Sequence, residues 1–174
     1  MDTLNDALDT AWRLLGRGAA DRRSPVHTPV VASVGLGGAP DARSPKCAAL
    51  DGRAVAVLAY HPGEAVQLRL AGTARIVREG PQVEQIWATS TPFARRCYLV
   101  EAPPGCALPA PGSALPAFVE GRAPEAAELV PARANFALVV VTVTAIDWLH
   151  LAQGGHRRAQ FSAADGWAGG WVVP

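Results

Sequence analysis

The segment NFALVVVTVTAIDWLHL, residues 135–151, decides the fold class, because it holds the longest apolar stretch of the chain and is rich in valine and threonine. Such β-branched density predicts a strand, and a glycine turn at 153–155 leads into a second strand at 156–162. Another turn at 163–166 precedes a short terminal strand at 171–174. The apolar stretch is too short, and too often interrupted by threonine, to span a bilayer.

Three further strand signals lie upstream. Residues 30–34 are β-branched, and residues 53–60 are interpreted as a buried strand. Residues 65–79 alternate between apolar and polar side chains, with Gly72 in the middle. A glycine at that place indicates a sharp bend, so this segment is predicted to be either two strands or one bent strand.

Helical signals are confined to the start and the middle of the chain. Apolar side chains at helical spacing predict an amphipathic helix over residues 3–17, ended by the glycines at 16 and 18. A second, short helix is expected from Pro81 to Thr89. Prolines and glycines over 102–116 predict a long loop, and residues 124–133 are expected to add a helical turn or two.

This order of elements predicts a mainly β fold, a small antiparallel barrel with an N-terminal helix and short helices covering one end. The chain has 174 residues, of which 49% are hydrophobic, and this suits one domain over residues 1–174.

Composition narrows the classes of function. The net charge is +1 and the arginines are interspersed with acids, which disfavours nucleic acid and anionic membranes as partners. The N-terminus lacks a signal pattern, so a cytoplasmic location is expected. The cysteines are odd in number and lack metal-site spacing, and the histidines also lack it, so reduced thiols and no metal are predicted. The glycines at 35–38 are interpreted as a turn rather than a dinucleotide loop.

Cations and an aromatic ring recur on separate β segments, at Arg43 and Lys46, at Arg95 and Arg96, and at Arg157 and Arg158 near Trp148. Converging guanidinium groups suit a phosphate, and an amide such as that of Gln67 suits the polar edge of a heterocycle. The alternative is that each arginine pair is a solvated strand end and that Trp148 belongs to the core.

Seven segments in order resemble the pyridoxamine 5'-phosphate oxidase-like family of FMN-binding split barrels, in particular its short bacterial branch. They are residues 11–43, 43–50 (RSPKCAAL), 67–76 (QLRLAGTARI), 91–99 (TPFARRCYL), 133–151, 154–161 (GGHRRAQF) and 171–174 (WVVP). The resemblance implies an antiparallel split β-barrel of six strands, a homodimer, and FMN held between the subunits. It also implies an oxidoreductase acting on a small substrate.

The resemblance carries functional roles to particular residues. Arg43, Ser44 and Lys46 match the basic turn that grips the flavin phosphate. Gln67 matches the glutamine that faces the isoalloxazine ring. Arg158 matches the arginine that closes the flavin site, and Trp148 lies near the position of a flavin-contacting tryptophan.

Substrate-side residues depart from the vitamin-forming oxidases. The motif Tyr-x-x-x-Arg-Pro-x-x-Ser becomes Trp87, Thr91, Pro92 and Arg95, and the C-terminal Arg-x-His-x-Arg keeps only His156 and the flavin-side arginine. Arg95, His156 and Arg157 are left as candidate substrate contacts. Pyridoxamine phosphate is disfavoured as the substrate, because several charge-assisted contacts are lost.

The resemblance also implies a hairpin between PDAR, residues 40–43, and SPK, residues 44–46. This chain passes directly from Arg43 to Ser44 without it. Loss of a hairpin removes two antiparallel strands, so the remaining strands can still pair, but the barrel is not expected to close and the phosphate grip should weaken. Two alternatives to the oxidoreductase stay open. One is a non-catalytic flavin- or haem-binding module, and the other is a truncated remnant that binds FMN weakly.

Overall fold

The computed structural model describes residues 3–27, 29–32 and 40–174. The chain divides into two compact units, the first comprising Met1–Gly37, Arg53–Ala74 and Val141–Pro174, and the second Gly38–Gly52 and Arg75–Val140. The second unit is thus made of two segments that interrupt the first unit along the chain. The single-domain prediction stays a prediction.

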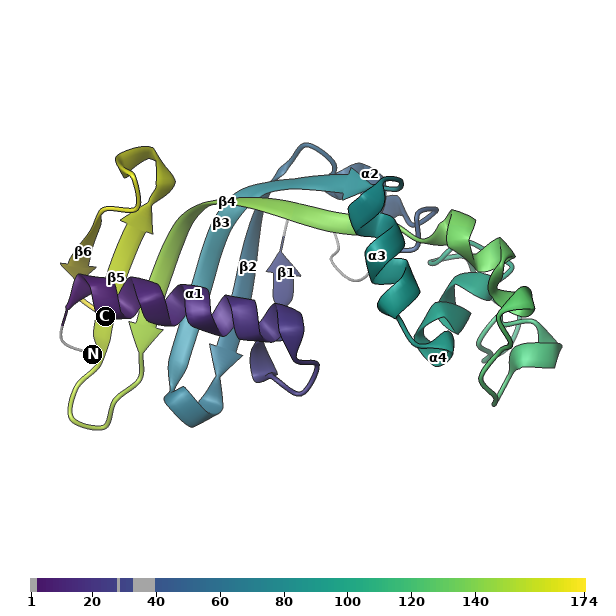
Figure 1. Ribbon diagram of the computed structural model, residues 1–174, viewed down its shortest axis with the longest axis horizontal. Helices are drawn as coiled ribbons and strands as arrows, with labels where there is room; N and C mark the ends of the chain where they lie inside the picture. The colour runs from purple at the N-terminus through teal and green to yellow at the C-terminus, as the bar shows by residue number, and fades with distance from the viewer. Residues whose placement is uncertain (1–2, 28, 33–39) are drawn as a thin grey trace. The chain divides into compact units, whose positions relative to one another are not determined.

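The strands form one sheet in the order β1-β2-β3-β4-β5-β6, which confirms the mainly β, antiparallel class (Figure 1). Their bounds are β1 Val30–Ala32, β2 Ala54–His61, β3 Val66–Val77, β4 Leu138–His150, β5 Arg157–Ser162 and β6 Gly169–Val172. Among the described residues β1 and β6 are the two ends of this order, so the expected barrel closure is not found. Each pair with a described register is antiparallel.

β1 pairs directly with β2, with Val30 opposite Leu58 and Ala32 opposite Ala56. From residue 40 to residue 53 the described chain forms a single bridge, Asp41 to Phe136, and the helix α2, Pro45–Leu50. The rest of the predicted strand at 33–34 and the glycine turn at 35–38 lie outside the described residues.

β3 is one continuous strand of twelve residues, so the prediction of one bent strand is confirmed over that of two. Gly72 lies where β3 passes close to β4. A Cβ atom built at Gly72 would overlap the carbonyl oxygen of Thr142 and lie 2.9 Å from Cγ1 of Val141. Only glycine permits this approach of the two backbones.

β2 forms where a buried strand was predicted, but it alternates between buried and exposed side chains, so only one of its faces is buried. Val55, Val57 and Ala59 face the core, whereas Leu58 and Tyr60 are 40% and 42% exposed. An antiparallel sheet that is covered on one face shows this pattern, because successive side chains point to opposite sides.

The helix α1, Leu4–Ala20, lies across the strands of the first unit and covers one face of the sheet (Figure 1). Thr3 and Asp6 form a capping box at its start, which satisfies backbone donors of the first turn. Its apolar stripe meets the inward side chains of the strands. The core contains Ala7, Ala11, Leu14, Val57, Val66, Leu68, Leu70, Ile146, Trp148, Ala159 and Phe161.

α1 continues through both glycines that were predicted to end it, and it stops at Asp21, whose backbone N–H donates to Arg17 O. The prediction of an end at residue 17 is therefore wrong. Gly18 is buried against Val26, and a Cβ there would lie 2.8 Å from Val26 O, whereas a Cβ at Gly16 would meet nothing within 4 Å. Gly18 thus serves packing between the helix and the segment after it.

Replacing these two glycines with alanine should change stability in opposite directions. Gly16→Ala is expected to raise the free energy of unfolding by about 0.5–1 kcal/mol, because alanine loses less backbone entropy in a helix. Gly18→Ala is expected to lower it by about 1–3 kcal/mol through overpacking. Urea unfolding of both variants measures the difference, and equal effects of the same sign would contradict the packing described here.

The second unit is built from short helices, including α2, α3 at Pro81–Thr89 and α4 at Pro92–Arg95. α3 has the predicted bounds. Residues 102–116 contain no helix or strand, and the turns predicted in 124–133 appear as the 3-10 helices Ala127–Leu129 and Pro131–Asn135. The interior of the second unit contains two groups of side chains. One is Leu99, Val119, Leu129 and Ala132, and the other is the mutually contacting rings of Trp87, Tyr98 and Phe136.

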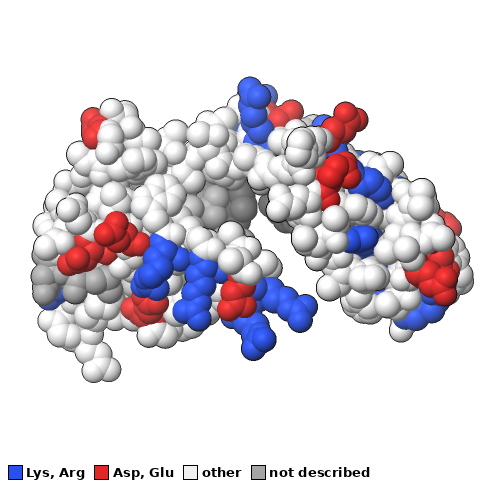
Figure 2. Space-filling view, in the orientation of Figure 1, with Lys and Arg blue, Asp and Glu red and all other residues white. Residues whose placement is uncertain are grey.

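Basic and acidic side chains lie next to one another on the face shown in Figure 2, as expected from the interspersed charges of the sequence. Three arginines are paired with glutamates, namely the exposed Arg13 with Glu64, the exposed Arg122 with Glu128, and the partly buried Arg133 with Glu84. No helix in the described part of the chain combines the length and apolarity that a membrane span requires.

Candidate functional site

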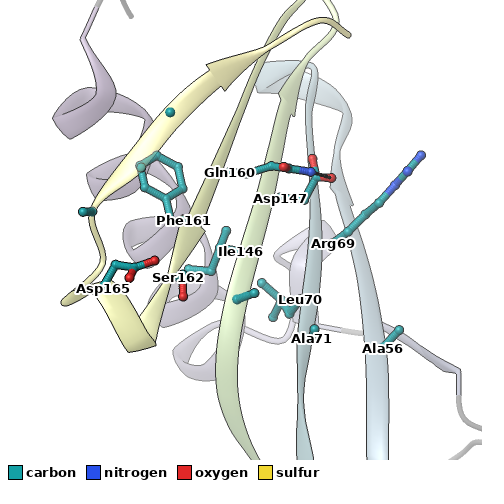
Figure 3. Close-up of a pocket in the computed structure, with 14 residues that line it drawn as sticks. Ala56, Arg69, Leu70, Ala71, Ile146, Asp147, Gln160, Phe161, Ser162 and Asp165 are labelled. Atoms are coloured by element: carbon teal, nitrogen blue, oxygen red, sulfur yellow. Dashed lines mark hydrogen bonds between the residues drawn. The ribbon is translucent and has the colours of Figure 1, made fainter.

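A cavity of about 690 Å³ lies in the first unit, on the sheet and its final turn (Figure 3). Its volume is within the range of small-molecule and cofactor sites, roughly 300–1,000 Å³. Residues of five strands and of the turn between β5 and β6 line it. They are Ala56, Arg69, Leu70, Ala71, Ala145, Ile146, Asp147, Gln160, Phe161, Ser162, Asp165, Ala168, Gly169 and Gly170.

Small side chains line the cavity where the strands pass. Ala56 of β2 pairs with Ala71 of β3, and Ala145 of β4 pairs with Ser162 of β5. Gly169 lies against the ring of Phe161, where an added Cβ would overlap the ring. Alanine and glycine at these positions leave a flat apolar surface on which a planar ring can lie.

A network of hydrogen bonds lies on the same face as these alanines. Asp147 accepts from Arg158 at 2.6 and 2.9 Å and from the amide of Gln160 at 3.1 Å. The Arg158 hydrogen bonds, followed by that of Gln160, outweigh burial and lower the pKa of Asp147 below its ordinary value. Asp147 therefore stays a carboxylate at neutral pH.

A separate hydrogen-bonded pair on this face joins Gln67 and Arg69, which are two residues apart on β3 and so share a face. The guanidinium of Arg69 donates through Nε to the Gln67 side-chain oxygen at 2.9 Å. Figure 3 shows Arg69 at the opposite side of the drawn residues from Asp165. Each end of the cavity thus carries a charged side chain.

The structure brings Gln67 and Arg158 to one face of the sheet, because both alternate with core residues on their strands. Trp148 lies on the other face, where it is fully buried beneath α1 and contacts the ring of Trp171 at a centroid distance of 6.2 Å. A ring bound over Gln67 and Arg158 would not contact Trp148 across the sheet. The flavin-binding roles of all three stay predictions.

Arg43 and Ser44 have structural partners in the second unit. The Arg43 guanidinium donates to both carboxylate oxygens of Asp41, at 3.0 and 2.7 Å, to Val100 O at 2.9 Å and to Glu101 O at 3.3 Å. The Ser44 hydroxyl caps α2 by accepting from the backbone N–H of Lys46 at 3.4 Å. Lys46 itself is half-buried on the first turn of this helix.

The candidate substrate contacts lie in different units. Arg95 stacks on Trp87, with its guanidinium carbon 5.1 Å from the ring centroid, and donates to Ala88 O at 2.7 Å. His156 and Arg157 are exposed, just before β5 and at its first residue. Because Arg95 belongs to the second unit and the other two to the first, their convergence on one substrate stays a prediction.

Asp147, Gln160 and Arg69 are site residues that sequence reasoning missed. A signal for Asp147 was present, since it is a lone carboxylate in an otherwise apolar strand. Its partner could not be read from the sequence, because the register that sets Asp147 opposite Gln160 and beside Arg158 depends on how β4 pairs with β5.

No protein-family model matches the chain, and no curated protein matches it. Solved structures do. An antiparallel sheet of this order with helices defines the class of fold seen in pyridoxamine 5'-phosphate oxidase-related proteins, which confirms the expected family likeness at the level of the fold.

Two particular structures carry this likeness. One is a pyridoxamine 5'-phosphate oxidase-related, FMN-binding protein from Nostoc punctiforme, with a TM-score of 0.67, 16% identity, and coverage of 95% of this chain and 96% of that one. The other is PhzG from Burkholderia lata, solved with tetrahydrophenazine-1-carboxylic acid, with a TM-score of 0.62, 13% identity, and coverage of 96% and 92%.

Proposed function

We propose that this protein is an FMN-binding flavoprotein of the pyridoxamine 5'-phosphate oxidase-like family, working as an oxidoreductase on a small substrate. The observation that carries the proposal is the cavity of about 690 Å³ on a sheet of this fold, flanked by the Gln67–Arg69 and Asp147–Arg158 pairs. The likeness in fold to an FMN-binding protein supports the same ligand class.

The residues present fit the ring of this cofactor. Ala56, Ala71 and Ala145 supply a flat apolar surface, and the side-chain amides of Gln67 and Gln160 offer donors and acceptors to a polar ring edge. A bound flavin would supply the electron transfer. The residues of the chain would orient the ring and exclude water from one side of it. Gln67 holds Arg69 at the edge of the cavity through their hydrogen bond.

A homodimer in the cytoplasm completes the proposal. Leu58 and Tyr60 are 40% and 42% exposed on the same face of β2 as the cavity residue Ala56. Large apolar side chains gathered beside a cavity favour a partner that covers them. A second copy of this chain is the partner that the family resemblance implies.

Two alternatives are separated from this proposal by observations on the purified protein. If the protein binds flavin but NADPH does not reduce this flavin and oxygen does not reoxidise it, a non-catalytic flavin- or haem-binding module is favoured. A truncated remnant is supported by β1 and β6 being the two ends of the strand order among the described residues, and it would aggregate or bind flavin only weakly.

FMN titration of the purified protein tests the proposal. We expect saturable binding, seen as a change in the visible absorbance and fluorescence of the flavin. Ala56→Trp should abolish it by filling the cavity, because Ala56 lines it on the exposed face of β2. Ala54→Trp is the matched control, since Ala54 lies on the same face of the same strand outside the lining. Absence of binding up to about 1 mM, equivalent to about 4 kcal/mol, would refute the proposal.

A further inference from the structure

Both arginines predicted to hold the flavin are already held by a carboxylate of their own. Arg158 makes two hydrogen bonds from Nε and one from Nη2 to Asp147, the Nη2 bond being 2.6 Å. The Arg43 guanidinium makes the equivalent bidentate ion pair with Asp41, with a shortest hydrogen bond of 2.7 Å. It also donates hydrogen bonds to Val100 O and Glu101 O. Planar forks of this kind are the geometry in which a guanidinium would otherwise receive a phosphate.

The charges around the cavity lead to the same conclusion. Its lining includes one cation, Arg69, and two carboxylates, Asp147 and Asp165. Adding Arg158, which is paired with Asp147, brings the formal charge of the group to zero. A site that receives a phosphate dianion ordinarily presents an excess of cations or unpaired backbone donors.

The hydroxyl of Ser44 is also committed, because Ser44 is 6% exposed and caps α2. Lys46, which has an interaction of its own, completes the predicted phosphate grip. An ammonium group that is not fully buried acts as a point charge, and such a contact is worth about fivefold or less in affinity.

We propose that this site selects its ligand by the flat ring and not by the phosphate, so that riboflavin and FMN bind with nearly equal affinity. The inference rests on the proposed function, since it concerns the same cavity. Asp147 is the specificity-determining residue, because it neutralises Arg158 and thereby removes the attraction for an anionic tail. The site's ligand class is then an uncharged planar heterocycle, with the phosphorylated form tolerated rather than required.

Parallel titrations with riboflavin and FMN, at low and high salt, test the inference. We expect an affinity ratio of less than about tenfold and little dependence on salt, because an ionic contact to phosphate would be screened. A preference for FMN above about a hundredfold would overturn the inference and leave the proposed function intact. Failure of both flavins to bind would overturn the proposed function, and the inference with it.

The residue assignment is tested with Asp147→Asn, which keeps the shape of the side chain and releases Arg158 from its counter-charge. The preference for FMN over riboflavin should then rise by about tenfold or more and become sensitive to salt. Asp165→Asn is the matched control, because it removes a negative charge from the same lining without releasing Arg158. A ratio that is unchanged in Asp147→Asn, or raised equally in Asp165→Asn, would overturn the role of Asp147. Circular dichroism confirms that both variants are folded.

Discussion

Replacing Arg43 with alanine is expected to lower the free energy of unfolding by about 3–5 kcal/mol, the cost of removing one partner of a buried ion pair. Asp41 is 6% exposed and the Arg43 side chain 28%, so the carboxylate left behind would be buried without its counter-charge. The variant also loses the hydrogen bonds to Val100 O and Glu101 O. These bonds tie the start of α2 to the segment after the 3-10 helix Arg96–Leu99.

Chemical denaturation of the variant measures this loss. Arg22→Ala is the control for the removal of a positive charge, because Arg22 is an exposed arginine and its loss should change stability by less than about 0.5 kcal/mol. The double variant Asp41→Asn/Arg43→Met should recover part of the stability, since the buried carboxylate and its counter-charge leave together. A loss below about 1 kcal/mol in Arg43→Ala would show that the ion pair is not formed as described, and would free Arg43 for a phosphate.

Gly72→Ala is expected to lower the free energy of unfolding by about 3 kcal/mol, at the upper end of the usual cost of overpacking. The added methyl group would meet the backbone carbonyl of Thr142, which cannot rotate away as a side chain can. β3 and β4 would have to separate at this point. Their hydrogen bonding nearby, such as that from the Thr144 hydroxyl to Ala71 O at 3.2 Å, would weaken as well.

The control is Gly170→Ala in β6, where an added Cβ meets nothing within 4 Å. Its effect should stay within about 0.5 kcal/mol, as for other surface substitutions. Thermal unfolding of the two variants compares their changes in unfolding temperature. A larger change in Gly72→Ala shows that its cost comes from the close approach of the two backbones and not from placing alanine in a strand. Equal shifts in both would contradict the close approach at Gly72.

Local signals predicted much of the fold. The valine-rich segment became β4, the alternation of residues 65–79 became β3, and Pro81 and Thr89 are the ends of α3. Two features of the fold were not predicted, for one reason. The pattern predicts a buried strand at residues 53–60 and an end of α1 at its glycines, because neither the exposed outer face of the sheet nor the packing of Gly18 on Val26 is visible in a one-dimensional pattern.

The sequence predicted some residues of the candidate site, but not the side chains with which they pair. Gln67 and Arg158 were chosen from the resemblance, and both lie on the cavity face of the sheet. The carboxylates that occupy the arginines were not foreseen, because Asp147 is eleven residues from Arg158 and meets it only through the pairing of β4 with β5. Asp41 is two residues from Arg43, so this pair could have been suspected, but its burial could not.

By itself, the sequence determined the strands, the helices α1 and α3 and the order of these elements, since these depend on local propensity, whereas α2 and α4 were not predicted. The tertiary structure alone decided that β1 and β6 are the two ends of the strand order among the described residues, that Trp148 lies beneath α1, and that Arg43 and Arg158 each face a carboxylate. Strand register and burial set these features, because they bring together side chains that no spacing along the chain relates.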